Sequence, residues 1–75
     1  MRMVAVKSST LAAVGYDAVR KLLHLEFCSG AVYRYFSVPA GVHAALLNAT
    51  SKGSFFNRSI RGRFAYRQSP LRGQE

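Results

Sequence analysis

The sequence lacks the residues on which several classes of small domain depend. Its 75 residues include one cysteine, Cys28, and no tryptophan. One cysteine cannot form an intramolecular disulfide, so a disulfide-stabilised fold is excluded. Besides Cys28, only His24 and His43 could supply zinc ligands of the usual nitrogen or sulfur type, and we therefore expect neither a metal nor a cofactor. A single thiol suits a reducing compartment, which predicts a cytoplasmic location.

Acidic residues are also scarce, which bears on catalysis. The chain has only three, Asp17, Glu26 and Glu75, so paired-carboxylate chemistry would require the first two to meet. Cys28 and His24 are four residues apart on a predicted strand, about 13 Å, which is too far for a thiol–imidazole pair. A Gly-x-x-x-x-Gly-Lys phosphate loop is absent. We therefore expect a protein that is not an enzyme.

Long apolar runs are missing as well. No segment approaches the roughly 20 apolar residues of a membrane span. The apolar start, Met1 to Val6, is interrupted at Lys7 and is too short for a secretory signal, so we expect no membrane partner. Hydrophobic residues nevertheless make up 49% of the chain, which predicts one folded domain.

Alternating hydrophobicity predicts an antiparallel sheet in the first half of the chain. In segment 20–28, Leu23, Leu25 and Phe27 alternate with polar residues, the period of a half-buried strand. Segments 10–16 and 31–36 are the other predicted strands, and the second is rich in β-formers. Residues 3–6 fit either a short strand or a frayed terminus.

The turn at Ser29-Gly30 leaves two hairpin registers open. A two-residue loop pairs Leu25 with Arg34, which puts a charge on the apolar face. A loop with a glycine bulge pairs Leu25 with Tyr33, so that the tyrosines join the leucines and Arg34 faces water. We favour the bulged hairpin because burial of an unpaired charge is costly.

Two helices are predicted after the sheet. Pro39 ends the last strand and can occupy a first helical turn, so 39–49 is predicted as a helix. Ser51 is a candidate N-cap for a second helix to about Arg61, and Gly62 is a natural stop. The predicted fold is α+β, a three-stranded antiparallel meander followed by two helices packed on one face. It forms a single domain, 1–66, with a mobile tail, 67–75.

The ordered motifs of the chain resemble one known family, the KTSC domain, over roughly residues 8–66. The matching positions are Ser8-Ser9, Val14-Gly15-Tyr16-Asp17, Phe27-x-x-Gly30-x-x-Tyr33-x-Tyr35-x-x-Val38-Pro39 and Ser51-x-Gly53-x-Phe55-Phe56-Asn57-x-x-Ile60-Arg61. The family takes its name from its occurrence at the C-terminus of some lysyl-tRNA synthetases, and it also occurs as small single-domain bacterial and phage proteins. The resemblance implies RNA binding as the expected activity.

The net charge of +8 gives an independent reason to expect a polyanionic partner. The predicted nucleic-acid-binding residues are the basic set of the C-terminal segment together with the central strand, namely Lys52, Arg58, Arg61, Arg63, Arg67, Arg34, Tyr33 and Tyr35. Arginine pairs well with phosphate, and exposed tyrosines can stack on unpaired bases. The alternative for the tyrosines is packing in the core, which the bulged register favours.

Two functions remain open from the sequence. The leading prediction is a small non-catalytic nucleic-acid-binding module, for RNA rather than DNA, that binds through its basic C-terminal helix. The alternative is a protein-interaction module, with an acidic protein as partner and no role in nucleic-acid binding. Neither the composition nor the motifs determine the oligomeric state.

Overall fold

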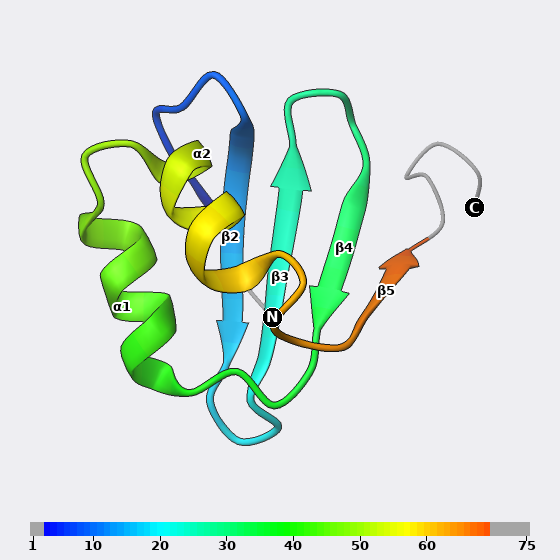
Figure 1. Ribbon diagram of the computed structural model, residues 1–75. Coiled ribbons are helices and arrows are strands. Elements are labelled where there is room, and N and C mark those ends of the chain that lie inside the picture. Colours follow the sequence, from blue (N-terminus) through cyan, green and yellow to red (C-terminus); the bar gives the residue numbers. More distant parts are fainter. Residues whose placement is uncertain (1–2, 70–75) are drawn as a thin grey trace.

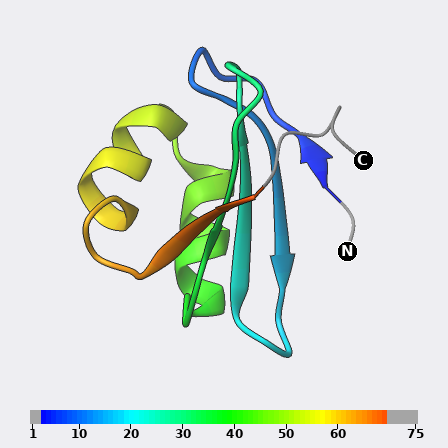
Figure 2. The same cartoon turned by 90° about the vertical axis from the view of Figure 1, so that its right-hand side faces the viewer.

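An antiparallel sheet with helices on one face forms the protein in the computed structural model, which describes residues 3–69 (Figure 1). The five strands lie side by side in chain order: β1 (Val4–Ala5), β2 (Leu11–Asp17), β3 (Leu22–Phe27), β4 (Val32–Tyr35) and β5 (Tyr66–Ser69). Two helices, α1 (Ala40–Asn48) and α2 (Lys52–Phe55), follow β4, and α2 continues into a π-helical turn, η1 (Phe56–Ile60). Figure 2 shows that all the helical segments lie on the same side of the sheet.

The predicted α+β class and the placement of both helices on one face are confirmed, but the predicted strand count was wrong. The sheet has five strands rather than three. The short segment 4–5 pairs with β2 at one edge, and residues 66–69 pair with β4 at the other. Residues 67–69 were predicted to begin a mobile tail, and instead they belong to the sheet. The rest of that predicted tail, 70–75, lies outside the described residues.

The bulged hairpin predicted between β3 and β4 is confirmed. Leu25 is the cross-strand partner of Tyr33, and Leu23 is the partner of Tyr35. Gly30 provides the bulge with a φ of +98°, a conformation that glycine adopts without steric cost. The Gly30 N–H donates to the Phe27 carbonyl at 2.8 Å, which closes the turn.

Local capping signals set the ends of the second helical segment. The Ser51 side chain accepts a hydrogen bond from the backbone N–H of Ser54 at 3.3 Å, as predicted for an N-cap. Gly62 has a φ of +77° and ends the segment just beyond η1. Gly53 lies so close to Thr10, the residue before β2, that a Cβ built on it would be 2.6 Å from the Thr10 Oγ1 atom. A side chain at position 53 would therefore require Thr10 to shift.

The hydrophobic core lies between the helices and the sheet face that they cover. Its buried residues come from β2, β3, β4, the β4–α1 connection, α1 and η1: Leu11, Val14, Leu23, Leu25, Tyr35, Val38, Leu46, Phe56 and Ile60. No helix within residues 3–69 is long and apolar enough to cross a membrane. An open space lies on the helical side of the sheet, beside β4 and η1.

Candidate functional site

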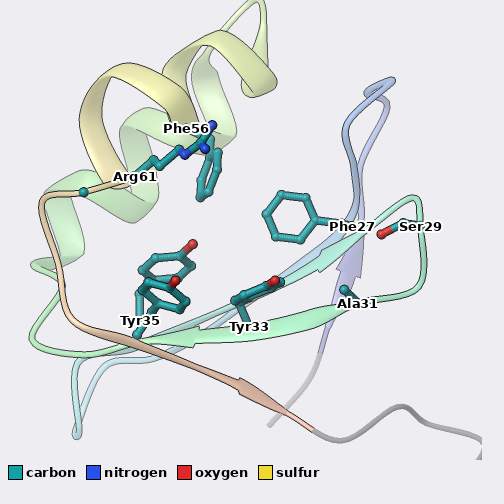
Figure 3. A pocket seen from close by; sticks show the side chains of 9 residues that line it. Phe27, Ser29, Ala31, Tyr33, Tyr35, Phe56 and Arg61 are labelled. Carbon is teal, nitrogen blue, oxygen red and sulfur yellow. The ribbon is translucent and has the colours of Figure 1, made fainter.

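An aromatic pocket opens between the β4–β5 end of the sheet and η1 (Figure 3). We use this name for the cavity of about 350 Å³ whose principal walls are Phe27, Tyr33, Tyr35, Phe56, Tyr66 and Arg61. The β3–β4 turn closes one end with Ser29 and Ala31. The residues come from two regions that are far apart in the sequence, 27–35 and 56–66.

The floor of the pocket is built by strand alternation. Tyr33 and Tyr35 are two residues apart on β4, so both side chains project from the helical face of the sheet. Their ring centroids lie 6.4 Å apart with an interplanar angle of 29°. Phe27, at the end of β3, meets Tyr33 edge to face at 5.5 Å. The same alternation that forms the core thus presents an aromatic surface to the pocket.

The π-helical turn supplies the opposite wall. The Arg61 N–H donates to the Phe56 carbonyl at 2.9 Å, the five-residue step that defines this turn. Phe56 then points into the sheet and meets Phe27 at 5.2 Å and Tyr35 at 5.8 Å, both edge to face. Arg61 directly follows η1, and its side chain lies beside Phe56 in Figure 3. The turn therefore brings one guanidinium group to an aromatic cavity.

Strand β5 completes the pocket with Tyr66. This residue is the cross-strand partner of Tyr35, and its ring lies 5.4 Å from the Tyr35 ring and 5.5 Å from the Tyr33 ring. Tyr66 remains 58% exposed, whereas Tyr35 is only 4% exposed. The pocket therefore has a deep side at Tyr35 and an open side at Tyr66.

The deep side of the pocket keeps Tyr35 protonated. Burial, reinforced by the neighbouring Tyr66 and Tyr33, raises the pKa of Tyr35 to about 12, and the Arg61 charge opposes the shift. The Tyr35 hydroxyl makes no hydrogen bond to any atom of residues 3–69. At neutral pH, this hydroxyl is therefore available as a hydrogen-bond donor and acceptor to a molecule in the pocket.

Three of the predicted basic residues lie around η1 and the loop after it. Arg58, Arg61 and Arg63 are all exposed, and Arg61 is the one that lines the pocket. The Arg63 Nε–H donates to the Arg58 carbonyl at 2.9 Å, which satisfies a carbonyl near the end of η1. This bond fixes the direction of the Arg63 side chain and leaves its terminal N–H groups able to bind an anion.

The other predicted basic residues lie elsewhere. Lys52 is half-buried, and its ammonium group donates to the Ala49 carbonyl at 3.1 Å. This hydrogen bond stabilises the junction between α1 and α2. Arg34 and Arg67 are cross-strand partners, and they alternate with the pocket tyrosines along β4 and β5. Their side chains therefore project from the sheet face opposite the helices. The structure thus divides the predicted set instead of gathering it at one site.

The sequence left Tyr33 and Tyr35 either in the core or on a binding surface, and the structure confirms the core packing that the bulged register favoured. Tyr35 belongs to the buried core, Tyr33 packs against that core at intermediate exposure, and both line the pocket. Sequence reasoning missed Phe27, Phe56 and Tyr66 as site residues. Phe27 and Phe56 could have been found, because both belong to the family motif. Tyr66 lies outside that motif, and only its aromatic side chain pointed to a site.

Comparison with known proteins identifies the family. The family model for the KTSC domain matches residues 7–64, and the chain belongs to this family. An uncharacterised protein of Stutzerimonas stutzeri is 50% identical over 58 residues, which cover 77% of this chain and 82% of that protein. The crystal structure of a KTSC domain protein from Yersinia pestis has a TM-score of 0.90 at 33% identity, covering 92% of this chain and 97% of that one.

Larger proteins contain a similar segment. A lysine–tRNA ligase of a Nostoc species is 44% identical over 62 residues, which cover 83% of this chain. The chain spans only 11% of the length of that ligase. The similarity therefore concerns a small part of the ligase, and the activity of the whole enzyme is not carried over to this chain.

Proposed function

We propose that this protein binds single-stranded nucleic acid, RNA in preference to DNA, through the exposed arginines around η1 and the aromatic pocket beside them. The observation that carries the proposal is the position of Arg61, which is exposed to solvent and also lines an aromatic cavity. Arginine binds phosphate oxygens with its planar fork, and aromatic rings bind the faces of unstacked bases. Single-stranded nucleic acid presents both groups side by side.

The charge balance supports the same partner. The chain carries 11 basic and 3 acidic residues, so a polyanion is attracted before any specific contact forms. Arg58 and Arg63 extend the basic surface next to Arg61 along one segment. Lys52, Arg34 and Arg67 lie outside the proposed surface, because the Lys52 ammonium group donates to the Ala49 carbonyl and the two arginines lie on the opposite sheet face.

The preference for RNA rests on relatives rather than on geometry. Several similar proteins are named lysine–tRNA ligase, and the substrate in that name is an RNA. A cytoplasmic location is part of the proposal, since RNA is available there and the exposed Cys28 is a free thiol. An acidic protein partner is the competing proposal, because the same arginines would also bind carboxylates.

A salt titration tests the proposal. Binding of a fluorescently labelled single-stranded RNA should weaken steeply as salt rises, with a slope of about 0.7 for each phosphate that is neutralised. Replacing Arg58 and Arg61 with alanine together should lower that slope by about 1.4. Arg20→Ala is the matched control, since Arg20 is an exposed cation in the β2–β3 turn, outside the pocket.

Three outcomes would count against the proposal. Absence of binding at low salt would overturn it. Equal loss of affinity in the Arg20 and Arg58/Arg61 variants would show that binding depends on the net charge of the protein and not on the arginines around η1. Competition by polyglutamate as strong as that by RNA of equal charge would favour the acidic protein partner instead.

A further inference from the structure

The shape of the aromatic pocket restricts what it can hold. Its volume of about 350 Å³ is near the lower end of the range for small-molecule sites. Phe27 and Phe56 meet edge to face on one side, and the Tyr33 and Tyr35 rings lie 29° from parallel on the other. Flat, apolar walls of this kind fit one planar aromatic ring better than a bulky or flexible group.

The polar groups of the pocket restrict the chemistry of that ring. The Tyr35 hydroxyl lies at the deep side, in a residue that is 96% buried, and it has no hydrogen-bond partner within residues 3–69. Although the residue is buried, its hydroxyl oxygen is not among the buried atoms without a partner in residues 3–69, so a molecule in the pocket can reach it as a hydrogen-bond donor and acceptor. The occupant should therefore carry a hydrogen-bonding edge that reaches Tyr35, which a hydrocarbon ring lacks.

The charge of the pocket restricts the occupant further. Arg61 is the charged residue of the lining, and it lies near enough to Tyr35 to affect the ionisation of that hydroxyl. An aromatic pocket can also attract cations, but a guanidinium group at its wall opposes a cationic ligand. An aromatic ring with hydrogen-bonding atoms and an attached anion satisfies all three features, and a nucleotide is such a group.

We propose that the aromatic pocket takes one unstacked base of the bound RNA, with the base against Tyr33 and Phe27, its edge on the Tyr35 hydroxyl and an adjoining phosphate on Arg61. This inference rests on the proposed RNA binding and adds the place at which a base is recognised. It predicts that a phosphate backbone alone is an incomplete ligand. It also predicts that the hydroxyl of Tyr35 contributes to binding and not to folding.

The experiment compares three probes on the same protein: a single-stranded RNA 12-mer, an abasic ribose-phosphate 12-mer of equal charge, and the mononucleotides AMP and UMP. Tyrosine fluorescence reports on the pocket directly, because the chain has no tryptophan and three of its four tyrosines line the pocket. We expect the RNA to quench this fluorescence and the abasic strand to bind at least tenfold more weakly without quenching.

The outcomes separate this inference from the proposal on which it rests. Equal affinity for the RNA and the abasic strand would overturn the base pocket and leave RNA binding by the arginines intact. No binding of either strand would overturn both. If a mononucleotide binds and quenches as tightly as the RNA, the occupant is a free nucleotide, and the assignment to RNA is overturned.

Two variants test the pocket without removing its walls. Tyr35→Phe deletes only the hydroxyl, and it should lower RNA affinity about tenfold while leaving the melting temperature unchanged. Ala31→Phe should fill the end of the cavity and lower RNA affinity at least tenfold, with the salt dependence retained because the arginines remain. Wild-type affinity in both variants would overturn the inference.

Discussion

Arg34 on β4 and Arg67 on β5 are directly opposite each other on the sheet face that the helices leave open. His24 is the partner of Arg34 on the other side, and burial together with the Arg34 charge lowers the pKa of His24. The Arg34 Nε atom is buried and has no hydrogen-bond partner among residues 3–69. Like charges in opposed positions destabilise a sheet, so this pair is a weak point of the β4–β5 pairing.

The first prediction concerns this pair. Arg67→Glu replaces repulsion with attraction and should stabilise the protein by about 0.5–1 kcal/mol at low salt, with a smaller gain at high salt. Urea denaturation at two salt concentrations measures the effect. Lys7→Glu makes the same change in net charge at an exposed site outside the sheet. An equal gain in that control would show that the effect comes from net charge rather than from the opposed pair.

A second prediction concerns two glycines in helices. Gly53→Ala should destabilise the protein by about 1–3 kcal/mol, because its Cβ would lie 2.6 Å from Thr10 Oγ1 and 3.1 Å from Thr10 Cβ. Gly41→Ala is the matched control in α1, where a Cβ meets no atom within 4 Å. It should be neutral or stabilise by up to about 1 kcal/mol. Thermal melts of both variants would decide, and equal melting temperatures would refute the close approach.

A third prediction concerns the exit from the sheet. The Tyr16 hydroxyl donates a hydrogen bond to the carbonyl of Val38, a residue with no exposed surface. Tyr16→Phe should cost about 1–3 kcal/mol, since it leaves that carbonyl without its partner while the ring stays stacked on His43. Tyr66→Phe is the control, because the Tyr66 hydroxyl is on an exposed residue. Equal stability of the two variants would show that the bond contributes little.

The fourth prediction is a dependence of stability on pH. Tyr35 ionises near 10 when unfolded, but its pKa is raised to about 12 in the folded protein, first through burial and then through Tyr66 and Tyr33. Between these values the unfolded chain has released a proton that the folded protein retains, so rising pH favours unfolding. The stabilisation is complete below pH 10 and is lost as pH rises towards 12.

Denaturation midpoints measured from pH 8 to pH 11 check this prediction. Wild type should lose stability above pH 10 more steeply than Tyr35→Phe, which cannot ionise at that position. The other ionisable groups are common to both proteins, so the difference between the two curves isolates Tyr35. Parallel curves would show that the Tyr35 hydroxyl reaches water as freely in the folded state as in the unfolded state.

The central hairpin and the helix boundaries could be predicted from the sequence because they depend on local physics. The alternation around Leu23 and Leu25 defines a strand face, and the cost of burying Arg34 selects one register from two. Ser51 and Gly62 mark the ends of a helical segment by hydrogen bonding and backbone freedom. Each of these signals acts within a few residues, and the structure follows all of them.

The fifth strand and the pocket were decided by tertiary structure. Tyr66–Ser69 has no strong strand signal of its own, and it becomes a strand because the edge of β4 offers unpaired backbone groups. That pairing brings Tyr66 to Tyr35, while η1 brings Phe56 and Arg61 from the other side. The sequence by itself determined the charge, the hairpin and the helices. Only the tertiary structure decided which cation meets the aromatic rings, because η1 places Arg61 at the pocket while strand alternation turns Arg34 and Arg67 to the opposite face of the sheet.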